Sequence, residues 1–371
     1  MLPVTIPSTA ELAELTDYRD EASVSIYLPS SPLPTENQAI RLAVKNAARR
    51  AGALLDEHNA DKVVIDRILD RIAGLDDDPE FWQNQGAGLG VLVSPDRLQA
   101  FRLLEQVSES VLVGDRFSVG PLLRSLGMAN AGYVLAVTDG DICFYGIVAG
   151  NRPTKLNLEL PSDLHSVLER ADNAGQADRG RATGSHGQRI EQQRYCRLIQ
   201  DAALERIGDK RLPLILAASA GLGPSYRSVN KYPGLLPEGI EVHPDSLSKD
   251  ELDSHAKAIL ERHYRTELEQ WREDFGTKRS QGLATSELDE VARAAAASAI
   301  ATLHFDVAST IEGTIDEQGT ITRSDEPGRG SYPIVDELAA RVVRSGGSAQ
   351  AVQNSDLMDG SPVAAILRFP I

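Results

Sequence analysis

Two β-branched runs joined by Asp139-Gly140 constrain the fold of this chain more than any other feature of its sequence. The runs cover Tyr133–Thr138 and Ile142–Val148. An Asp-Gly pair between two such runs is typical of a tight two-residue turn between antiparallel strands. The sequence therefore predicts a hairpin here. Further on, the short continuous apolar run Leu212–Ala218 predicts a strand buried on both faces.

Helices and strands are expected to alternate along the rest of the chain. Helical apolar spacing predicts helices at 35–58, 60–73, 190–207, 246–275, 287–299 and 334–345. β-rich runs predict strands at 23–28, 88–94, 98–104, 107–113, 157–160, 240–242, 301–307, 349–353 and 363–369. We expect a loop at 221–234 and a polar, glycine-containing span at 309–331. The pattern predicts an α/β protein of three domains, each a mixed sheet with helices, at 1–125, 126–245 and 246–371.

Composition narrows the class of protein. The chain has 371 residues, 42% of them hydrophobic, and a net charge of −16. No apolar run approaches the roughly 20 residues that span a bilayer, and the first residues lack the pattern of a secretory signal. We therefore expect a cytoplasmic protein with no membrane contact. The two cysteines, Cys143 and Cys196, predict neither a disulfide framework nor a cysteine zinc site.

A cationic segment, residues 179–197, stands out against this acidic background. Its net charge is about +4, because it holds one acid, Glu191, and five arginines: Arg179, Arg181, Arg189, Arg194 and Arg197. A local basic stretch on an acidic protein is typical of a phosphate-facing surface. The tip that precedes the helical part is small and polar, and its glycines allow close backbone approach to a ligand: Gly184, Ser185, His186, Gly187 and Gln188. The alternative is a mobile loop followed by a solvated helix face.

Other motifs carry weaker signals. The 226–232 stretch mixes basic and aromatic residues as RNA contacts do, although a plain polar loop explains it too. His255 and His263 lie eight apart, whereas metal ligands on one helix usually lie four apart. The glycines at 86–90 and the acids at 76–78 fit a sheet-edge turn and a helix-closing loop. We expect no metal and no cofactor.

From residue 131 onward, the order of elements resembles that of the archaeal and eukaryotic class-one release factors and Pelota. The hairpin GYVLAVTDGDICFYGIVAGN resembles the opening of their middle domain, and GSHGQR with the helix that follows resembles their Gly-Gly-Gln loop and helix. LPLILAAS resembles the next strand. GLATSELDEVARAAAASAIATLHFD and SPVAAILRFPI resemble parts of their C-terminal α/β/α sandwich. The chain looks closest to the bacterial and archaeal branch that contains the ribosome hibernation factor Balon.

The resemblance places Gly187 and Gln188 at the second glycine and the glutamine of the tripeptide, and His186 at the first glycine. In release factors this tripeptide helps water to attack the peptidyl-tRNA ester. A side chain at the first position restricts backbone angles that glycine adopts freely. The resemblance therefore implies A-site docking more than hydrolysis, and the N-terminal part shows no codon-reading motif.

The expected function is ribosome association in hibernation, rescue or stress protection without catalysis. The arginines of the cationic segment would contact ribosomal RNA, with the tip near peptidyl-tRNA and the C-terminal domain available to a translation factor. One alternative is a peptide-release enzyme that uses Gln188, which Gln188→Ala would inactivate. Another is a protein-binding adaptor without RNA contact, whose partner would survive nuclease and high salt.

Overall fold

The computed structural model describes residues 7–83, 85–103, 106–127, 131–138, 141–148, 153–160, 184–208, 212–219, 221–241, 247–324 and 331–371. The chain forms two compact units. The middle unit is residues 130–266, and the split unit combines residues 3–129 with residues 267–371. The division into three domains expected from the sequence stays a prediction. By their contacts, the residues before and after the middle unit form one unit. The α/β class is confirmed.

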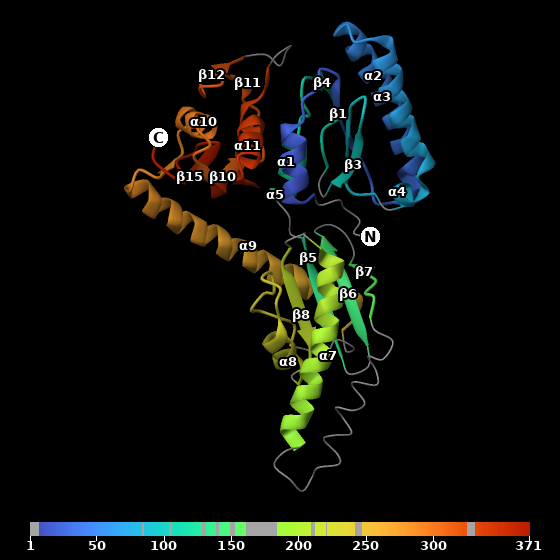
Figure 1. The fold of residues 1–371 in the computed structure, drawn as a ribbon, viewed down its shortest axis with the longest axis vertical. Coiled ribbons are helices and arrows are strands. Elements are labelled where there is room, and N and C mark those ends of the chain that lie inside the picture. The colour runs from blue at the N-terminus through green and yellow to red at the C-terminus, as the bar shows by residue number, and fades with distance from the viewer. Residues whose placement is uncertain are drawn as a thin grey trace. The chain divides into compact units, whose positions relative to one another are not determined.

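The middle unit is built on a four-stranded sheet in the order β7-β6-β5-β8 (Figure 1). Its strands are β5 (Ala131–Val137), β6 (Ile142–Val148), β7 (Thr154–Leu156) and β8 (Leu214–Ala218). The predicted hairpin is confirmed, because β5 and β6 pair antiparallel from Ala131↔Val148 to Val137↔Ile142. The predicted buried strand is confirmed as β8, which pairs parallel with β5 and is buried at every residue.

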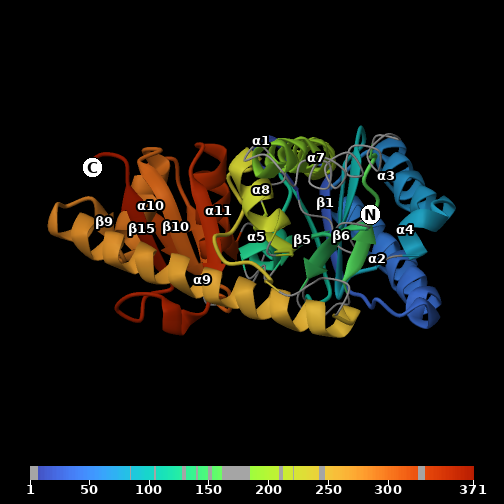
Figure 2. The same cartoon turned by 90° about the horizontal axis from the view of Figure 1, so that it is seen from below.

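Helices cover both faces of this sheet. Figure 2 shows α7 (Gly184–Ile207) and α8 (Leu222–Val229) on one side, and the first part of α9 (Lys249–Ser280) on the other. On the α9 side, Ala256, Ile259 and Leu260 pack against Val134 and Ile215 of the sheet. The N-terminus of α9 is capped: the Ser248 hydroxyl accepts from the Glu251 N–H at 3.2 Å, and the Glu251 carboxylate accepts from the Ser248 N–H at 2.9 Å.

The N-terminal part of the split unit is an antiparallel sheet in the order β3-β2-β1-β4, flanked by helices. Alternate residues of β1 are buried in two different hydrophobic cores. Val24, Ile26 and Leu28 pack in one core with the helices α2 and α3, and Tyr27 packs in a second core. The elements are α1 (Thr9–Asp17), β1 (Ser23–Pro29), α2 (Asn37–Glu57), α3 (Lys62–Gly74), α4 (Pro79–Gln83), β2 (Gly88–Val93), β3 (Leu98–Leu103), β4 (Ser110–Gly114) and α5 (Gly120–Gly127).

The C-terminal part contains two sheets, in the orders β14-β10-β15-β9 and β12-β11-β13. The predicted strands at 301–307, 349–353 and 363–369 are confirmed, and the polar span 309–331 contains two further strands, β11 and β12. The elements after α9 are β9 (Ala284–Thr285), α10 (Leu288–Ala296), β10 (Ile300–Asp306), β11 (Glu312–Ile315), β12 (Ile321–Arg323), β13 (Tyr332–Pro333), α11 (Ile334–Arg344), β14 (Ser348–Val352) and β15 (Val363–Leu367).

One hydrophobic core joins the two parts of the split unit. Leu15, Phe117 and Leu122 from the N-terminal part pack in the same cluster as Phe305 and Leu338 from the C-terminal part. The sequence alone placed these segments in separate domains, because pairing across more than 200 positions leaves no local pattern. The shared core packs residues 3–129 and 267–371 into one compact unit.

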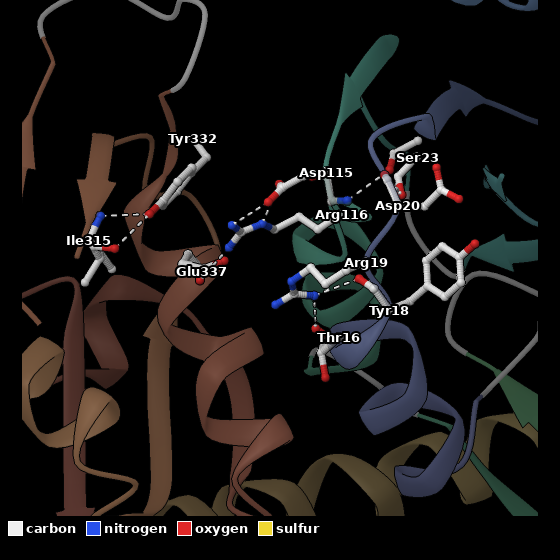
Figure 3. A network of polar contacts seen from close by, with 12 residues as sticks. Thr16, Tyr18, Arg19, Asp20, Ser23, Asp115, Arg116, Ile315, Tyr332 and Glu337 are labelled. Atoms are coloured by element: carbon white, nitrogen blue, oxygen red, sulfur yellow. Dashed lines mark hydrogen bonds and ion pairs between the residues drawn. The ribbon is translucent and has the colours of Figure 1, made fainter. Parts of the chain in front are cut away.

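Charged side chains bridge the same two parts (Figure 3). Arg116, just after β4, reaches Glu337 on α11 at 3.2 Å, and Arg341 reaches the same carboxylate oxygen at 2.9 Å. On α5, Arg124 contacts Asp336 through Nε at 2.9 Å and Nη2 at 2.7 Å. Both acids are 8% exposed. Burial raises the pKa of Asp336, and Arg124 opposes that shift.

Gly120 makes the close approach of α5 to α11 possible. A Cβ atom at this position would lie 1.9 Å from Oδ2 of Asp336. We expect Gly120→Ala to lower the free energy of unfolding by about 1–3 kcal/mol, because the helices must separate to admit the methyl group. Urea denaturation measures the change. Gly74→Ala, whose Cβ would have no neighbour within 4 Å, is the matched control, and equal losses in both variants would contradict the prediction.

Candidate nucleic-acid interface

The cationic segment is only partly within the described residues. Arg179 and Arg181 lie outside them, so the structure does not place these two predicted contacts. The other three arginines all lie on α7, and each is exposed: Arg189, Arg194 and Arg197. The cationic surface, as used below, means these three side chains.

The expected loop at 184–188 differs from the structure. α7 begins at Gly184, so the backbone of Gly184, Ser185, His186, Gly187 and Gln188 is helical there rather than a separate loop. Each residue added to an existing helix gains one hydrogen bond, which offsets the cost of the two glycines. The helix expected from about residue 190 is therefore longer at its N-terminus.

The opposite side of α7 is anchored in the core of the middle unit. Tyr195, Cys196 and Ile199 are at most 1% exposed, and the Tyr195 hydroxyl donates to the Thr138 carbonyl at 3.3 Å. Burial raises the pKa of Cys196 to about 12. The thiol therefore stays protonated and inert, which leaves α7 with a structural face and a charged outer face.

The three arginines are free to meet an external anion. Among the described residues, no ion pair involves Arg189, Arg194 or Arg197, and pairs such as Arg262 with Glu238 and Lys257 with Asp253 involve α9 instead. Arg189 and Arg197 lie eight positions apart on one helix, which separates their Cα atoms by about 12 Å along the axis. Since both point to the same side, they present two guanidinium groups to an extended anion such as a phosphate backbone.

The 221–234 stretch is a second difference from expectation. Instead of only a loop, it contains α8, with Leu222, Tyr226 and Val229 buried at helical spacing. That spacing was a signal in the sequence, obscured by Gly221, Gly223 and Pro224, and a proline is tolerated in the first turn of a helix. Tyr226 is fully buried and Tyr232 is 6% exposed, so neither aromatic ring can stack on RNA.

The weak metal signals of the sequence find no support within the described ranges. No group of three or more His, Cys, Asp or Glu side chains there could hold a metal ion. Asp76 instead pairs with Lys45 at 2.7 Å and Arg41 at 3.4 Å. Among the helices that the structure describes, none has both the length and the apolar character to cross a membrane.

Residues 129–266 match a family model described as bacterial archaeo-eukaryotic release factor family 11. This part of the chain is similar to that release factor family. The matched range coincides with the middle unit, which therefore corresponds to the family's domain. The resemblance expected from the sequence is confirmed, and α7 lies within the matched residues.

The chain also matches solved structures whose sequences have low identity to its own. An archaeal translation termination factor, aRF1, is 16% identical over 98% of this chain and 99% of its own, with a TM-score of 0.23. Archaeal Pelota, solved on the ribosome with ABCE1, is 15% identical over 74% and 72%, with a TM-score of 0.41. Pelota of Archaeoglobus fulgidus is 13% identical over 99% and 95%, with a TM-score of 0.31. The sequence has no significant match among curated proteins.

Proposed function

We propose that this protein associates with the ribosome, with its release factor domain in the A site and the cationic surface of α7 on ribosomal RNA. The observation that carries the proposal is the set of three exposed arginines on the long helix of a release factor domain, in a chain of net charge −16. Phosphates are the partner that such a local charge reversal fits.

The proposed role is hibernation, rescue or stress protection without catalysis. His186 stands where the resemblance expects the first glycine of the hydrolytic tripeptide, and the backbone there is helical. The thiol nearest to this surface along α7, Cys196, is buried. Docking by charge is therefore better supported than chemistry. We propose that the C-terminal part of the split unit receives a translation factor, because Dom34 of S. cerevisiae, a solved structure 13% identical to the chain, interacts with Hbs1.

Removing the cationic surface should release the protein from ribosomes. We expect Arg189→Ala/Arg194→Ala/Arg197→Ala to weaken binding about 100-fold at roughly 0.15 M salt, because three phosphate contacts and their released counterions are lost. The slope of log affinity against log salt should fall by about 2–3. Co-sedimentation of purified protein with bacterial ribosomes over a salt series measures both quantities.

A matched control removes three exposed arginines elsewhere: Arg67→Ala/Arg293→Ala/Arg323→Ala. This variant has the same net charge, so it should keep wild-type affinity if the position of the charge decides binding. Equal weakening of ribosome binding in both variants would show that net charge, and not the position of the arginines, determines the affinity. Absence of wild-type co-sedimentation at low salt and with ribosomes from stationary-phase cells would overturn the proposed function.

A further inference from the structure

The helix α8 is fastened along one side of α7 by polar contacts. The Gln193 amide donates to the Ser228 hydroxyl at 3.0 Å, and the Ser225 hydroxyl donates to Oε1 of Gln192 at 3.4 Å. Gln193 lies one turn from both Arg189 and Arg197 and therefore shares their side of α7. The end of α8 thus borders the cationic surface.

A buried glutamine fixes the residue that follows this end. Gln200 is 1% exposed, and its amide lies against the backbone of residues 229–231. With the amide oxygen and nitrogen exchanged, the orientation that satisfies both ends, it donates to the Val229 carbonyl at 2.6 Å and accepts from the Lys231 N–H. The backbone of Lys231 is therefore held against α7, while its side chain is exposed. A lysine with a fixed backbone loses less freedom when it binds an anion than one on a loose loop.

The position of Lys231 extends the charge of the cationic surface. Gln200 follows Arg197 by one turn, so Lys231 lies beside the turn after Arg197. On α7 itself the next exposed charged residue is an acid, Asp201. The next exposed basic residue of α7, Arg206, lies nine positions after Arg197. Lys231, from outside the helix, lies nearer to Arg197 and extends the basic row at this point.

Arg227 does not share this role. Its Nη1 donates to the Leu236 carbonyl at 2.8 Å, which ties the guanidinium to the segment after α8. Of the basic residues of the 226–232 stretch, Lys231 is the one whose backbone is fastened to α7.

We propose that Lys231 is a further RNA-binding residue, which contacts a phosphate of the strand held by Arg189 and Arg197, and that Gln200 is its positioning residue. The proposal rests on the RNA-binding role proposed for α7. It assigns the interface to two elements, α7 and the end of α8, rather than to one helix.

Ribosome binding over a salt series tests the role of Lys231. Lys231→Ala should weaken affinity about 5-fold at roughly 0.15 M salt and lower the salt slope by about 1, as one phosphate contact is lost. Lys231→Arg should restore both, since the charge and reach are kept. Lys62→Ala, an exposed lysine on α3, is the matched control and should leave both unchanged.

The positioning role of Gln200 has its own readout. Gln200→Met should reproduce the lower salt slope of Lys231→Ala, and the double variant Gln200→Met/Lys231→Ala should bind no more weakly than either single variant. A purely structural role would lower thermal stability without changing the slope. That result would overturn the assignment of Gln200.

Failure of this proposal is distinguishable from failure of the proposed function. If the wild type binds, the α7 triple variant is released, and Lys231→Ala keeps wild-type affinity and slope, then Lys231 is not a contact and this inference alone is wrong. If the wild type does not bind ribosomes at all, both the proposed function and the proposed role of Lys231 are wrong.

Discussion

Replacing Arg124 with methionine should lower the free energy of unfolding of the split unit by about 3–5 kcal/mol, because it leaves the Asp336 carboxylate buried without its partner. Arg124 also donates to the Val307 carbonyl at 2.6 Å and to the Ser309 carbonyl at 2.8 Å. One side chain on α5 therefore satisfies three acceptors of the C-terminal part. Urea denaturation followed by circular dichroism measures the loss.

A second substitution separates the unpaired charge from lost packing. Arg124→Met/Asp336→Leu replaces both charges by apolar groups and should recover most of the stability, as buried ion pairs exchanged for apolar pairs often do. The control Arg67→Met removes an exposed arginine and should change little. If the double variant is as unstable as Arg124→Met, the buried charge is not the cause.

The loss in Arg124→Met should also depend on pH. Burial already raises the pKa of Asp336, and without Arg124 nothing opposes that shift. The folded variant then binds a proton more tightly than the unfolded chain, so its stability is highest at low pH and falls as pH rises through the range in which Asp336 ionises. The stability gap between wild type and Arg124→Met should be smaller at pH 4 than at pH 7.

Acid should destabilise the same unit through His304. The imidazole of His304 is stacked on Trp271 of α9 at 3.7 Å between ring centroids, and its Nδ1 has no hydrogen-bond partner among the described residues. Burial, with a smaller effect of Arg272, lowers the pKa of His304 to about 4. The unfolded chain, with a histidine pKa of about 6.5, binds the proton first as pH falls.

The sign of the effect follows from these two values. Above about pH 6.5 the imidazole of His304 is neutral in both the folded and the unfolded state, and the full stability is present. Between about pH 6.5 and 4 the imidazole binds a proton in the unfolded state but not in the folded state, so the stability falls. The loss should reach about 3 kcal/mol at pH 4, at about 1.4 kcal/mol per pH unit. Denaturation curves recorded from pH 7.5 to pH 4 measure it.

His304→Phe keeps an aromatic ring for Trp271 and removes the titration, so the part of the acid loss due to His304 should disappear. His255→Phe is the control, because His255 is exposed on α9 and its replacement should leave the acid loss as in the wild type. An acid loss of the same size in His304→Phe and wild type would show that other groups cause it.

Local sequence patterns predicted most elements of this protein. The Asp-Gly hairpin, the helix at 35–58 and the strand at 212–218 are confirmed within a few residues, because each is defined by the spacing of its own apolar side chains. α1 and α5 were missed. Each is short and is stabilised by packing against distant segments, through residues such as Leu15 and Leu122.

The candidate site divides in the same way. The charge reversal at 179–197 is a property of composition, so the arginines could be identified from the sequence, and Arg189, Arg194 and Arg197 are indeed exposed together on one helix. The helical backbone at 184–188 could not be predicted from the sequence, because Gly184 and Gly187 have a low helix propensity. The burial of Tyr226 and the placement of Lys231 beside α7 depend on contacts between elements.

The sequence by itself thus determined the α/β class, the hairpin and the basic helix α7, since these follow from residues close together in the chain. Only the tertiary structure decided that residues 3–129 and 267–371, which flank the middle unit in the sequence, form one compact unit. The physical reason is that this body is joined by a shared apolar core and by pairs such as Arg124 with Asp336, 212 positions apart. No local pattern encodes which distant partner a buried side chain will meet.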